Sequence, residues 1–527
     1  MVVTLAVWSL LVQIFCGLAI GNLIAFNGPL VPYAKDMSRC ANRTQHWCEQ
    51  AAAFSTCVWT ESDGNGSAST ASVPGARAAC IDMCAERGVA PDSCGSDSQC
   101  QLTDGRCTSV GSLTTMWEAL FASATLMGAP LGAILSIWAL RRSPKFTCLV
   151  ACGAFLFGSA VLTVAWQMWW KAGMVVARVI IGVSLGLFTT GPANYNVSLI
   201  DDVAMRLRIA PFFQIACTLG IFLTSAVGIA LPSEDVNQDM ISRFQFYIGF
   251  AWFIGLVTTF VCIRCPPLPT AMTTTSPVPV VNPQDSGINR LAWVPLSPSS
   301  SAPLRCLPFV TAVLLSFSAQ FTGINAVMNY AASMSTAIGI RNPYVGNCAV
   351  MLWNFVTTLV SIPISRRKDV QPRKVFIGGI FVAAVACLMS GMPVMPGAME
   401  DSNTRSAVAI TGVAIFIAAF EIGVGSWYYL LAQDLFQEGR ERQIGCALNT
   451  NFVQLIFNLM IVFAYPYVTR ALSLSDGQPH RGFAIVTIAF GVTGFLSVAG
   501  LLLLMRPTES EIERAAQQDT SLQVDGG

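Results

Sequence analysis

Apolar runs of about 20 residues recur along this chain and are separated by short polar segments. A run of this length crosses the hydrocarbon core of a bilayer as a helix, so the pattern predicts membrane-spanning helices. The first run lacks a preceding basic segment and is too long for the apolar part of a cleaved signal peptide. We therefore expect it to be the first of twelve spans. The expected spans are 5–32, 112–140, 146–166, 174–197, 209–231, 244–262, 307–336, 345–364, 375–392, 406–433, 445–468 and 483–505.

Two long polar segments divide this series of spans. One, 35–111, lies between the first two spans, and the other, 264–305, is rich in Pro, Ser and Thr and predicts a flexible cytoplasmic connector. The connector separates a first six-helix half, 1–263, from a second, 306–505, and a polar tail follows at 506–527. We expect an all-α polytopic membrane protein of two six-helix halves, with a site between them.

Composition supports a membrane protein. Of the 527 residues 54% are hydrophobic and 11% are charged, and the mean hydropathy is +0.58, whereas soluble proteins have about 25% charged residues. A net charge of +1 gives no reason to expect a nucleic acid partner, and two histidines leave little scope for metal binding. The sequence shows no nucleophile–base constellation and no phosphate-binding loop. We therefore expect no enzyme activity, no cofactor, no metal and no obligatory protein partner.

Eight of the 18 cysteines are concentrated in the polar segment 35–111. Their even number and polar setting predict a disulfide-stapled loop in an oxidising compartment, although eight cysteines allow 105 pairings. The same segment contains two acceptor sites for N-glycosylation, Asn42 and Asn65, which places the loop on the extracellular side. The expected disulfide cysteines are Cys40, Cys48, Cys57, Cys80, Cys84, Cys94, Cys100 and Cys107.

Lys and Arg give an independent orientation. Most of those outside the spans fall on the loops that are cytoplasmic if the cysteine-rich loop is extracellular. Because cytoplasmic loops are enriched in Lys and Arg, both termini are expected in the cytoplasm.

The seventh span contains three amides inside an apolar run: Gln320, Asn325 and Asn329. A buried amide in lipid requires a partner, a cavity or a ligand, so these residues are either a binding site or hydrogen bonds between helices. Asn325 and Asn329 share one helical face, whereas Gln320 precedes Asn325 by about 500°. Gly323 permits a bend or local unwinding that would bring Gln320 and Asn325 to one cavity.

Other spans also contain polar residues, and nearly all are amides. A ligand covered in hydroxyl groups needs partners that both donate and accept, which amides do. Aromatic residues nearby can stack on a sugar ring, although each is more often lipid-facing or part of the packing. The polar residues are Gln214, Asn354, Glu421, Gln454 and Asn458, and the aromatic residues are Trp353, Trp427, Tyr428 and Tyr429.

Residues 320–327, Gln-Phe-Thr-Gly-Ile-Asn-Ala-Val, are similar to the seventh-helix signature Gln-x-x-Gly-Ile-Asn-Ala of the sugar porter branch of the major facilitator superfamily. Residues 322–330, 353–358 and 420–429 resemble the trypanosomatid hexose transporters, which also have a cysteine-rich first outer loop. The resemblance implies a major facilitator fold, a hexose such as glucose or fructose as substrate, and the plasma membrane as location.

The same resemblance implies roles for individual residues. The expected sugar-binding residues are Gln214, Gln320, Asn325, Asn354, Tyr429, Gln454 and Asn458. Asn329 and Tyr330 are expected at the outer gate, and Gly423 and Gly425 are expected to bend the tenth helix. A charged network at the inner gate is expected from Arg178, Arg206, Glu421, Asp434 and Arg440 or Arg442.

Proton coupling needs a membrane carboxylate that changes its charge. The resemblance aligns Leu23 with the acidic position of proton-coupled sugar porters, and Glu421 falls at the inner gate. Facilitated diffusion by alternating access is therefore favoured over proton symport. Ser198 stands where the family has a glutamate, and such departures in the gate motifs keep a third alternative, a sensor or receptor that does not transport.

Overall fold

Long helices account for most of the structure, a computed structural model. It describes residues 2–26, 57–60, 79–82, 100–103, 106–109, 115–168, 170–200, 205, 209, 211–230, 239–267, 307–338, 340, 342–365, 370–399, 401–425, 427–428, 431–432, 435, 452–474 and 481–505. Among these described residues, twelve helical segments are long and apolar enough to cross a membrane, which confirms the expected all-α membrane architecture.

The helices fall into two series along the chain. Those that precede the proposed connector are α1 (Val2–Ala25), α6 (Thr115–Leu140), α7 (Pro144–Gln167), α8 (Lys171–Phe188), α9 (Gly191–Leu199), α11 (Pro211–Gly228) and α12 (Asp239–Arg264). Those that follow it are α13 (Leu307–Phe321), α14 (Ile324–Ile338), α15 (Pro343–Ser365), α16 (Pro372–Gly391), α17 (Ser402–Ala419), α20 (Gln454–Leu474) and α21 (Arg481–Leu504). A 3₁₀ turn, Met392–Val394, follows α16, and a π-helix, Phe420–Gly425, continues α17.

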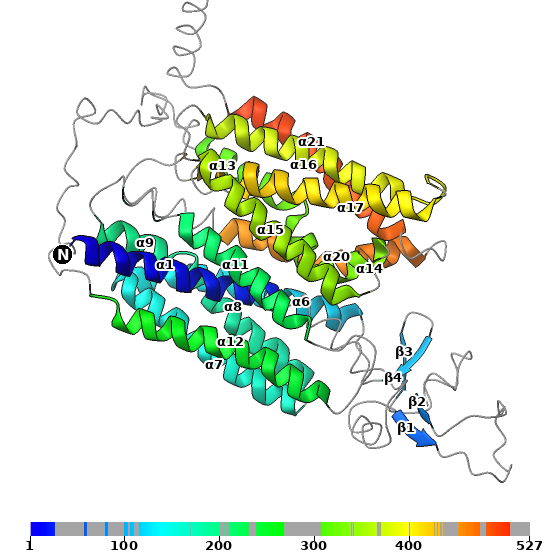
Figure 1. Cartoon of the computed structure of the whole chain (residues 1–527), viewed down its shortest axis with the longest axis horizontal. Helices are drawn as coiled ribbons and strands as arrows, with labels where there is room; N and C mark the ends of the chain where they lie inside the picture. Colours follow the sequence, from blue (N-terminus) through cyan, green and yellow to red (C-terminus); the bar gives the residue numbers. More distant parts are fainter. Residues whose placement is uncertain are drawn as a thin grey trace, which may run out of the picture.

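The two series occupy different sides of the molecule in Figure 1, with α1 to α12 below and α13 to α21 above. In the lower group α1 packs on α11, and α8 packs on both α6 and α7. In the upper group α16 packs on α17 and α21. The groups meet where α6 packs on α20 and α11 packs on α15.

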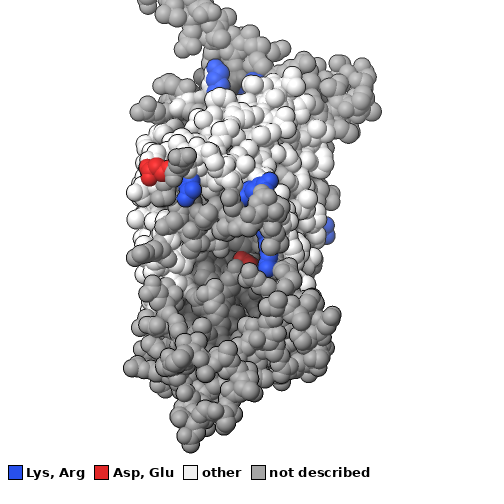
Figure 2. Space-filling model, turned by 90° about the vertical axis from the view of Figure 1, so that its right-hand side faces the viewer, with Lys and Arg blue, Asp and Glu red and all other residues white. Residues whose placement is uncertain are grey.

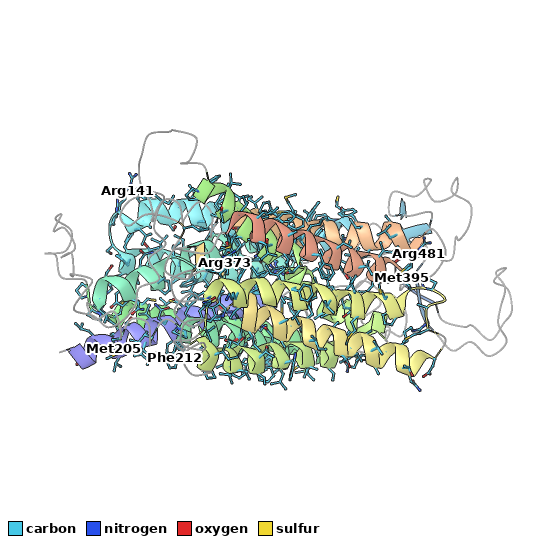
Figure 3. The ribbon with its side chains drawn as sticks, turned by 90° about the horizontal axis from the view of Figure 1, so that it is seen from above. Arg141, Met205, Phe212, Arg373, Met395 and Arg481 are labelled. Carbon is cyan, nitrogen blue, oxygen red and sulfur yellow. The ribbon has the colours of Figure 1, made fainter. Side chains whose placement is uncertain are left out.

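Connections between helices lie at both ends of the bundle. In Figure 3, Arg141, Met205 and Phe212 lie toward one end, whereas Met395 and Arg481 lie toward the other.

In Figure 2, which looks at the end near the strands, most of the visible described surface is uncharged. Large apolar side chains such as Leu503 (75% exposed) and Leu496 (67% exposed) face outward. Exposed apolar side chains such as these two leucines suit contact with lipid acyl chains.

The fourth expected span, 174–197, is not one continuous helix. It consists of α8 and α9, which are separated by a turn at Thr189 and Thr190. Gly191 and Pro192 begin α9, and proline at this position has no N–H to continue the ladder of α8. The span itself is confirmed, since Lys171–Asn196 is long and apolar enough to cross a membrane. The turn within it was not predicted, although its signal, Gly191 and Pro192, is present in the sequence.

Four short strands between α1 and α6 were not predicted. They form two antiparallel pairs, β1 (Cys57–Thr60) with β2 (Ala79–Asp82) and β3 (Cys100–Thr103) with β4 (Arg106–Ser109). Four of the eight loop cysteines lie on these strands. The others (Cys40, Cys48, Cys84 and Cys94) and both glycosylation acceptors (Asn42 and Asn65) lie outside the described residues. The disulfides and the glycosylation remain predictions.

Candidate functional site

The seventh span breaks between Gln320 and Asn325. Helix α13 ends at Phe321, and α14 begins at Ile324. Gly323 between them has φ +92°, a left-handed conformation that glycine adopts at little cost because it has no Cβ. The expectation that Gly323 interrupts this helix is confirmed.

The break brings the two amides together. Asn325 Nδ2 donates a hydrogen bond to Gln320 Oε1, and Asn329 Nδ2 donates to the Asn325 carbonyl at 2.9 Å. In an unbroken helix Gln320 and Asn325 would point about 140° apart. Gln320 and Asn329 are buried, and Asn325 is half-buried. The seventh span thus presents a pair of amides that satisfy each other and that a hydroxyl could enter as both donor and acceptor.

Tyr330 lies where α14 kinks. Its φ and ψ are −118° and 19°, which are not helical values. Its hydroxyl donates to the Val462 carbonyl of α20 at 2.8 Å, and its ring stacks on Tyr465 with centroids 4.8 Å apart. Glu118 of α6 lies close enough to interact electrostatically with both tyrosines. The two groups of helices therefore meet at this end of the bundle.

A second polar cluster surrounds Glu421 in the π-helix. Glu421 is 4% exposed, and its Oε2 accepts a hydrogen bond from Thr358 Oγ1 of α15 at 3.1 Å. The side chain of Gln214 from α11 also hydrogen-bonds to this carboxylate. Because Gln214 belongs to the first group of helices and Glu421 to the second, the carboxylate connects the two groups. The structure thus places Glu421 next to an expected sugar-binding residue.

Asn354 lies one helical turn before Thr358 on α15. The Thr358 hydroxyl is 2.9 Å from the Asn354 carbonyl as well as 3.1 Å from Glu421, so its single proton serves one acceptor at a time. Sequence reasoning missed Thr358. The signal was available, since a residue four positions after Asn354 shares its helical face.

Two expected sugar-binding asparagines have a buried acceptor oxygen that is unsatisfied. Within the described part of the chain, neither Asn354 Oδ1 nor Asn458 Oδ1 has a hydrogen-bond partner. Buried polar atoms are nearly always satisfied by protein, water or ligand. These two oxygens can therefore accept from a ligand hydroxyl or from water.

Gln454 and Asn458 lie in the first turns of α20. Phe457 between them packs edge-on against Phe317 and Phe321 of α13, with ring centroids 5.8 and 5.6 Å apart. These contacts place the start of α20 beside the end of α13, near the break in the seventh span.

The aromatic residues near these spans have packing roles where the structure describes them. Trp353 is 41% exposed and donates through Nε1 to the Ala414 carbonyl at 2.8 Å. Trp427 and Tyr428 are buried in an apolar cluster with Leu315. Tyr429, the expected pocket aromatic, lies outside the described residues.

Gly423 and Gly425 both lie in the π-helix, but only Gly423 is in tight packing. A Cβ added at Gly423 would meet the Cα of Gly379 on α16 at 2.5 Å, so this position has no room for a side chain. At Gly425 the nearest atom to such a Cβ is Glu421 Oε2, at 3.2 Å. Gly423 thus allows close packing of the π-helix on α16, and the bending role of both glycines remains a prediction.

The position of Arg178 requires a correction. Arg178 is buried, donates through Nη2 to Thr125 Oγ1 at 3.0 Å, and lies over the Phe26 ring, whose centroid is 5.8 Å from Cζ. It shares a cavity with Asn22 and Leu23, whereas the contacts of Glu421 come from α11 and α15. The resemblance to a family motif did not predict where along the membrane-spanning bundle Arg178 lies. The other expected inner-gate charges (Arg206, Asp434, Arg440 and Arg442) lie outside the described residues.

Comparison with protein families gives a match over most of the chain. Residues 10–270 and 291–505 match the family described as "Sugar (and other) transporter". The chain belongs to this family of sugar transporters.

Three relatives illustrate the range of sequence similarity to this chain. Glucose transporter HT1 of Trypanosoma vivax is 32% identical over 399 residues, which cover 74% of this chain and 70% of the relative. Membrane transporter D2 of Leishmania donovani is 28% identical over 440 residues, covering 79% and 74%. Human solute carrier family 2, facilitated glucose transporter member 4, is 24% identical over 417 residues, covering 74% and 77%.

Solved structures show the same fold. A D-xylose-proton symporter matches this family member with a TM-score of 0.64 at 16% identity, over 94% of this chain and 97% of that one. The xylose transporter of E. coli in an inward open conformation matches with a TM-score of 0.61 at 15% identity, over 98% and 100%. A structure of the proton:xylose symporter that is described as a member of the major facilitator superfamily matches with a TM-score of 0.62. The expected major facilitator fold is confirmed.

Proposed function

We propose that this protein transports a hexose by facilitated diffusion through alternating access. The observation that supports this most directly is the break at Gly323, which brings Gln320 and Asn325 into contact inside a membrane-spanning segment. Neutral amides suit a ligand covered in hydroxyl groups, since each hydroxyl both donates and accepts. The names of the relatives, two glucose transporters among them, support a hexose as the substrate.

The proposed sugar site combines the two polar clusters with the start of α20. In each cluster, polar side chains are paired with each other or have an unsatisfied oxygen, so a sugar could exchange hydrogen bonds with them at small net cost. Glu421 is added to the expected residues because it interacts with Gln214 and Thr358. The proposed site is formed by Gln214, Gln320, Asn325, Asn354, Glu421, Tyr429, Gln454 and Asn458.

Alternating access requires two bodies that move around a central site. We assign these bodies to the helices before and after residues 264–305, which lie on separate sides in Figure 1. The outer gate is proposed at Asn329 and Tyr330, and Gly423 and Gly425 are proposed to bend the tenth span. Arg206, Asp434 and Arg440 are proposed for the inner gate. Bound sugar would lower the cost of the occluded state by bridging groups from both bodies.

Uniport is favoured over proton symport by the environment of Leu23. This side chain is buried in the cavity that contains Arg178, at the position where the resemblance implies an acid in proton-coupled porters. Within the described spans only Glu118 and Glu421 are carboxylates. Glu118 lies in the first turn of its helix, and Glu421 hydrogen-bonds to Thr358 of α15 and Gln214 of α11.

The protein is proposed to lie in the plasma membrane with both termini in the cytoplasm. The distribution of Lys and Arg supports this orientation. The eight cysteines of 35–111 would then form disulfides in an oxidising compartment, and Asn42 and Asn65 would be glycosylated.

Uptake of labelled D-glucose into proteoliposomes that contain the purified protein tests the proposal. Saturable uptake, counterflow and competition by unlabelled D-glucose but not L-glucose are expected, with no response to an imposed pH gradient. Acceleration by an inward proton gradient would indicate a symporter. Sugar-dependent thermal stabilisation without counterflow would indicate a sensor or receptor. Competition by fructose, galactose and deoxyglucoses would then define which hydroxyls are recognised.

A further inference from the structure

The break in the seventh span leaves carbonyl groups without partners in their own helix. The last four carbonyls of any α-helix lack an i+4 N–H, and α13 ends at Phe321 in the membrane interior, where water cannot replace it. Two of these carbonyls are satisfied locally. Thr322 Oγ1 donates to the Ala319 carbonyl at 3.0 Å, and the Gly323 N–H donates to the Gln320 carbonyl at 3.0 Å.

The carbonyls at the break itself have partners on other helices. Thr493 Oγ1 of α21 donates to the Phe321 carbonyl at 2.9 Å. Cys387 Sγ of α16 lies 3.8 Å from the Thr322 carbonyl, as a weak donor. Thr493 is also 2.9 Å from the Phe490 carbonyl of its own helix, so its one proton is shared between a local and a distant acceptor. Of these contacts, the one from Thr493 is the strongest hydrogen bond to the break from another helix.

A second residue of α21 fills the space beside Gly323. The Phe490 ring lies where a Cβ at Gly323 would project, with three ring carbons as the nearest atoms. Phe490 and Thr493 are three residues apart on α21 and therefore share one face. That face contacts the backbone from Phe321 to Gly323, the segment that joins Gln320 to Asn325.

We propose that Thr493 and Phe490 are positioning residues for sugar binding, because they hold the seventh span in the broken conformation in which Gln320 faces Asn325. This inference rests on the proposed function for its effect on transport. Neither residue needs to touch the sugar. Thr493 caps the free carbonyl at the end of α13, and Phe490 occupies the volume into which the segment would move if the break closed. The twelfth span thereby fixes the geometry of a site formed by other spans.

The matched pair for a test is Thr493→Val and Thr487→Val. Both changes remove a hydroxyl from α21 while keeping the branched shape. Among the described residues, however, Thr487 Oγ1 bonds only to the Phe483 carbonyl of its own helix, at 2.8 Å. Thr493→Val is expected to raise the KM for D-glucose roughly 2- to 10-fold, the effect of one net hydrogen bond, with a smaller change in maximum rate. Thr493→Ser restores the hydroxyl and should return the KM to the wild-type value, and Thr487→Val should leave it unchanged.

A readout without sugar separates this inference from the proposed function. Hydrogen–deuterium exchange of the detergent-purified protein is measured over a peptide covering 318–327. Thr493→Val is expected to increase exchange there and Thr487→Val is not. If no hexose is transported but the exchange difference is present, the proposed function fails, whereas the role of Thr493 in holding the break is supported. If Thr493→Val transports with the wild-type KM and shows wild-type exchange, the inference is overturned.

A double-mutant cycle tests Phe490. Gly323→Ala introduces a Cβ that collides with the Phe490 ring, and Phe490→Ala removes that collision. If Phe490 acts through the break, both the KM and the hydrogen exchange of the double variant lie closer to the wild-type values than those of Gly323→Ala. Leu496 on the lipid-facing side of the same helix provides the control: Leu496→Ala should give no recovery. If the effects of Gly323→Ala and Phe490→Ala on KM and on exchange simply add in the double variant, Phe490 has no role at the break.

Discussion

The first and the seventh spans both contain amides, but they use them in opposite ways. Helix α1 is continuous from Val2 to Ala25. Its Gln13 donates to the Pro192 carbonyl at 2.6 Å, and its Asn22 donates to Thr224 Oγ1 at 2.9 Å, so each bonds to a neighbouring helix of the same group. In the seventh span Gln320 and Asn325 bond to each other across a break in their own helix.

The difference shows how a buried amide can be assigned. Gln13 bonds to a main-chain carbonyl of a helix in its own group, which is the arrangement expected of hydrogen bonds that join helices. The Gln320–Asn325 pair can be opened by a ligand that replaces both halves of the bond, because a hydroxyl both donates and accepts. The break at Gly323, rather than the number of amides, distinguishes a binding site from a helix contact.

The largest effect is expected from Gly323→Ala. A Cβ at φ +92° is strained by about 1–3 kcal/mol and would also collide with Phe490. We expect loss of most glucose uptake at equal amounts of protein in the proteoliposomes. Gly378→Ala on α16 is the control, since nothing lies within 4 Å of a Cβ placed there. Wild-type uptake by Gly323→Ala would show that the break is not required for transport. The break would then not distinguish the amides of the seventh span from those of α1.

The next effect in size is expected for the amide pair. Gln320→Ala and Asn325→Ala should each weaken apparent affinity by roughly 1 to 3 kcal/mol, which corresponds to an approximately 5- to 140-fold rise in KM. Because the two side chains bond to each other, the double variant should cost less than the sum of the single changes. Kinetics with D-glucose over a wide concentration range measures all three variants. A normal KM in both single variants would remove these residues from the site.

Gln13→Leu examines the other side of the comparison. The change removes the side-chain donor to the Pro192 carbonyl, a cost of about 0.5–1.5 kcal/mol to the folded protein. The unfolding temperature of the purified protein should fall, whereas the KM should stay within about 2-fold of wild type, since this is less than the effect of one net hydrogen bond. A rise in KM as large as that of Gln320→Ala, without loss of stability, would place Gln13 in the binding site and end the distinction between the two spans.

Much of the fold follows from the sequence because apolar length is a strong signal. The spans and the break at Gly323 are both readable from residue types. The break at Gly191 and Pro192 carried an equally plain signal but lies in a run that is long enough for one helix. The four strands between α1 and α6 are too short to leave a periodic pattern among polar residues.

The site was predictable as a set of residues but not as a set of contacts. Sequence similarity indicated Gln214 and Glu421 separately, and only the packing of α11 against α15 and the π-helix brings them together. Arg178 was misplaced because a motif gives the identity of a residue but not its partner. Thr493 gave no signal, since its role depends on α21 lying beside the end of α13.

Within the seventh span, the smallest effect on transport is expected at its far end, where this span resembles the first. Tyr330→Phe keeps the stack on Tyr465 but loses the hydrogen bond to the Val462 carbonyl. The bond holds Tyr330 beside Tyr465 and Glu118 of α6, where the two groups of helices meet, so we expect it to stabilise the conformation in which α6 and α20 are packed together. Its loss should then favour the outward-open state and lower the external KM by roughly 2- to 5-fold, the effect of one net hydrogen bond on a two-state equilibrium. Tyr465→Phe, which removes a hydroxyl from the other ring of the stack, is the control. An unchanged external KM together with a lower unfolding temperature would assign Tyr330, like Gln13, to helix packing, and the gating role proposed for Tyr330 would be lost while the roles of Gln320 and Asn325 would stand.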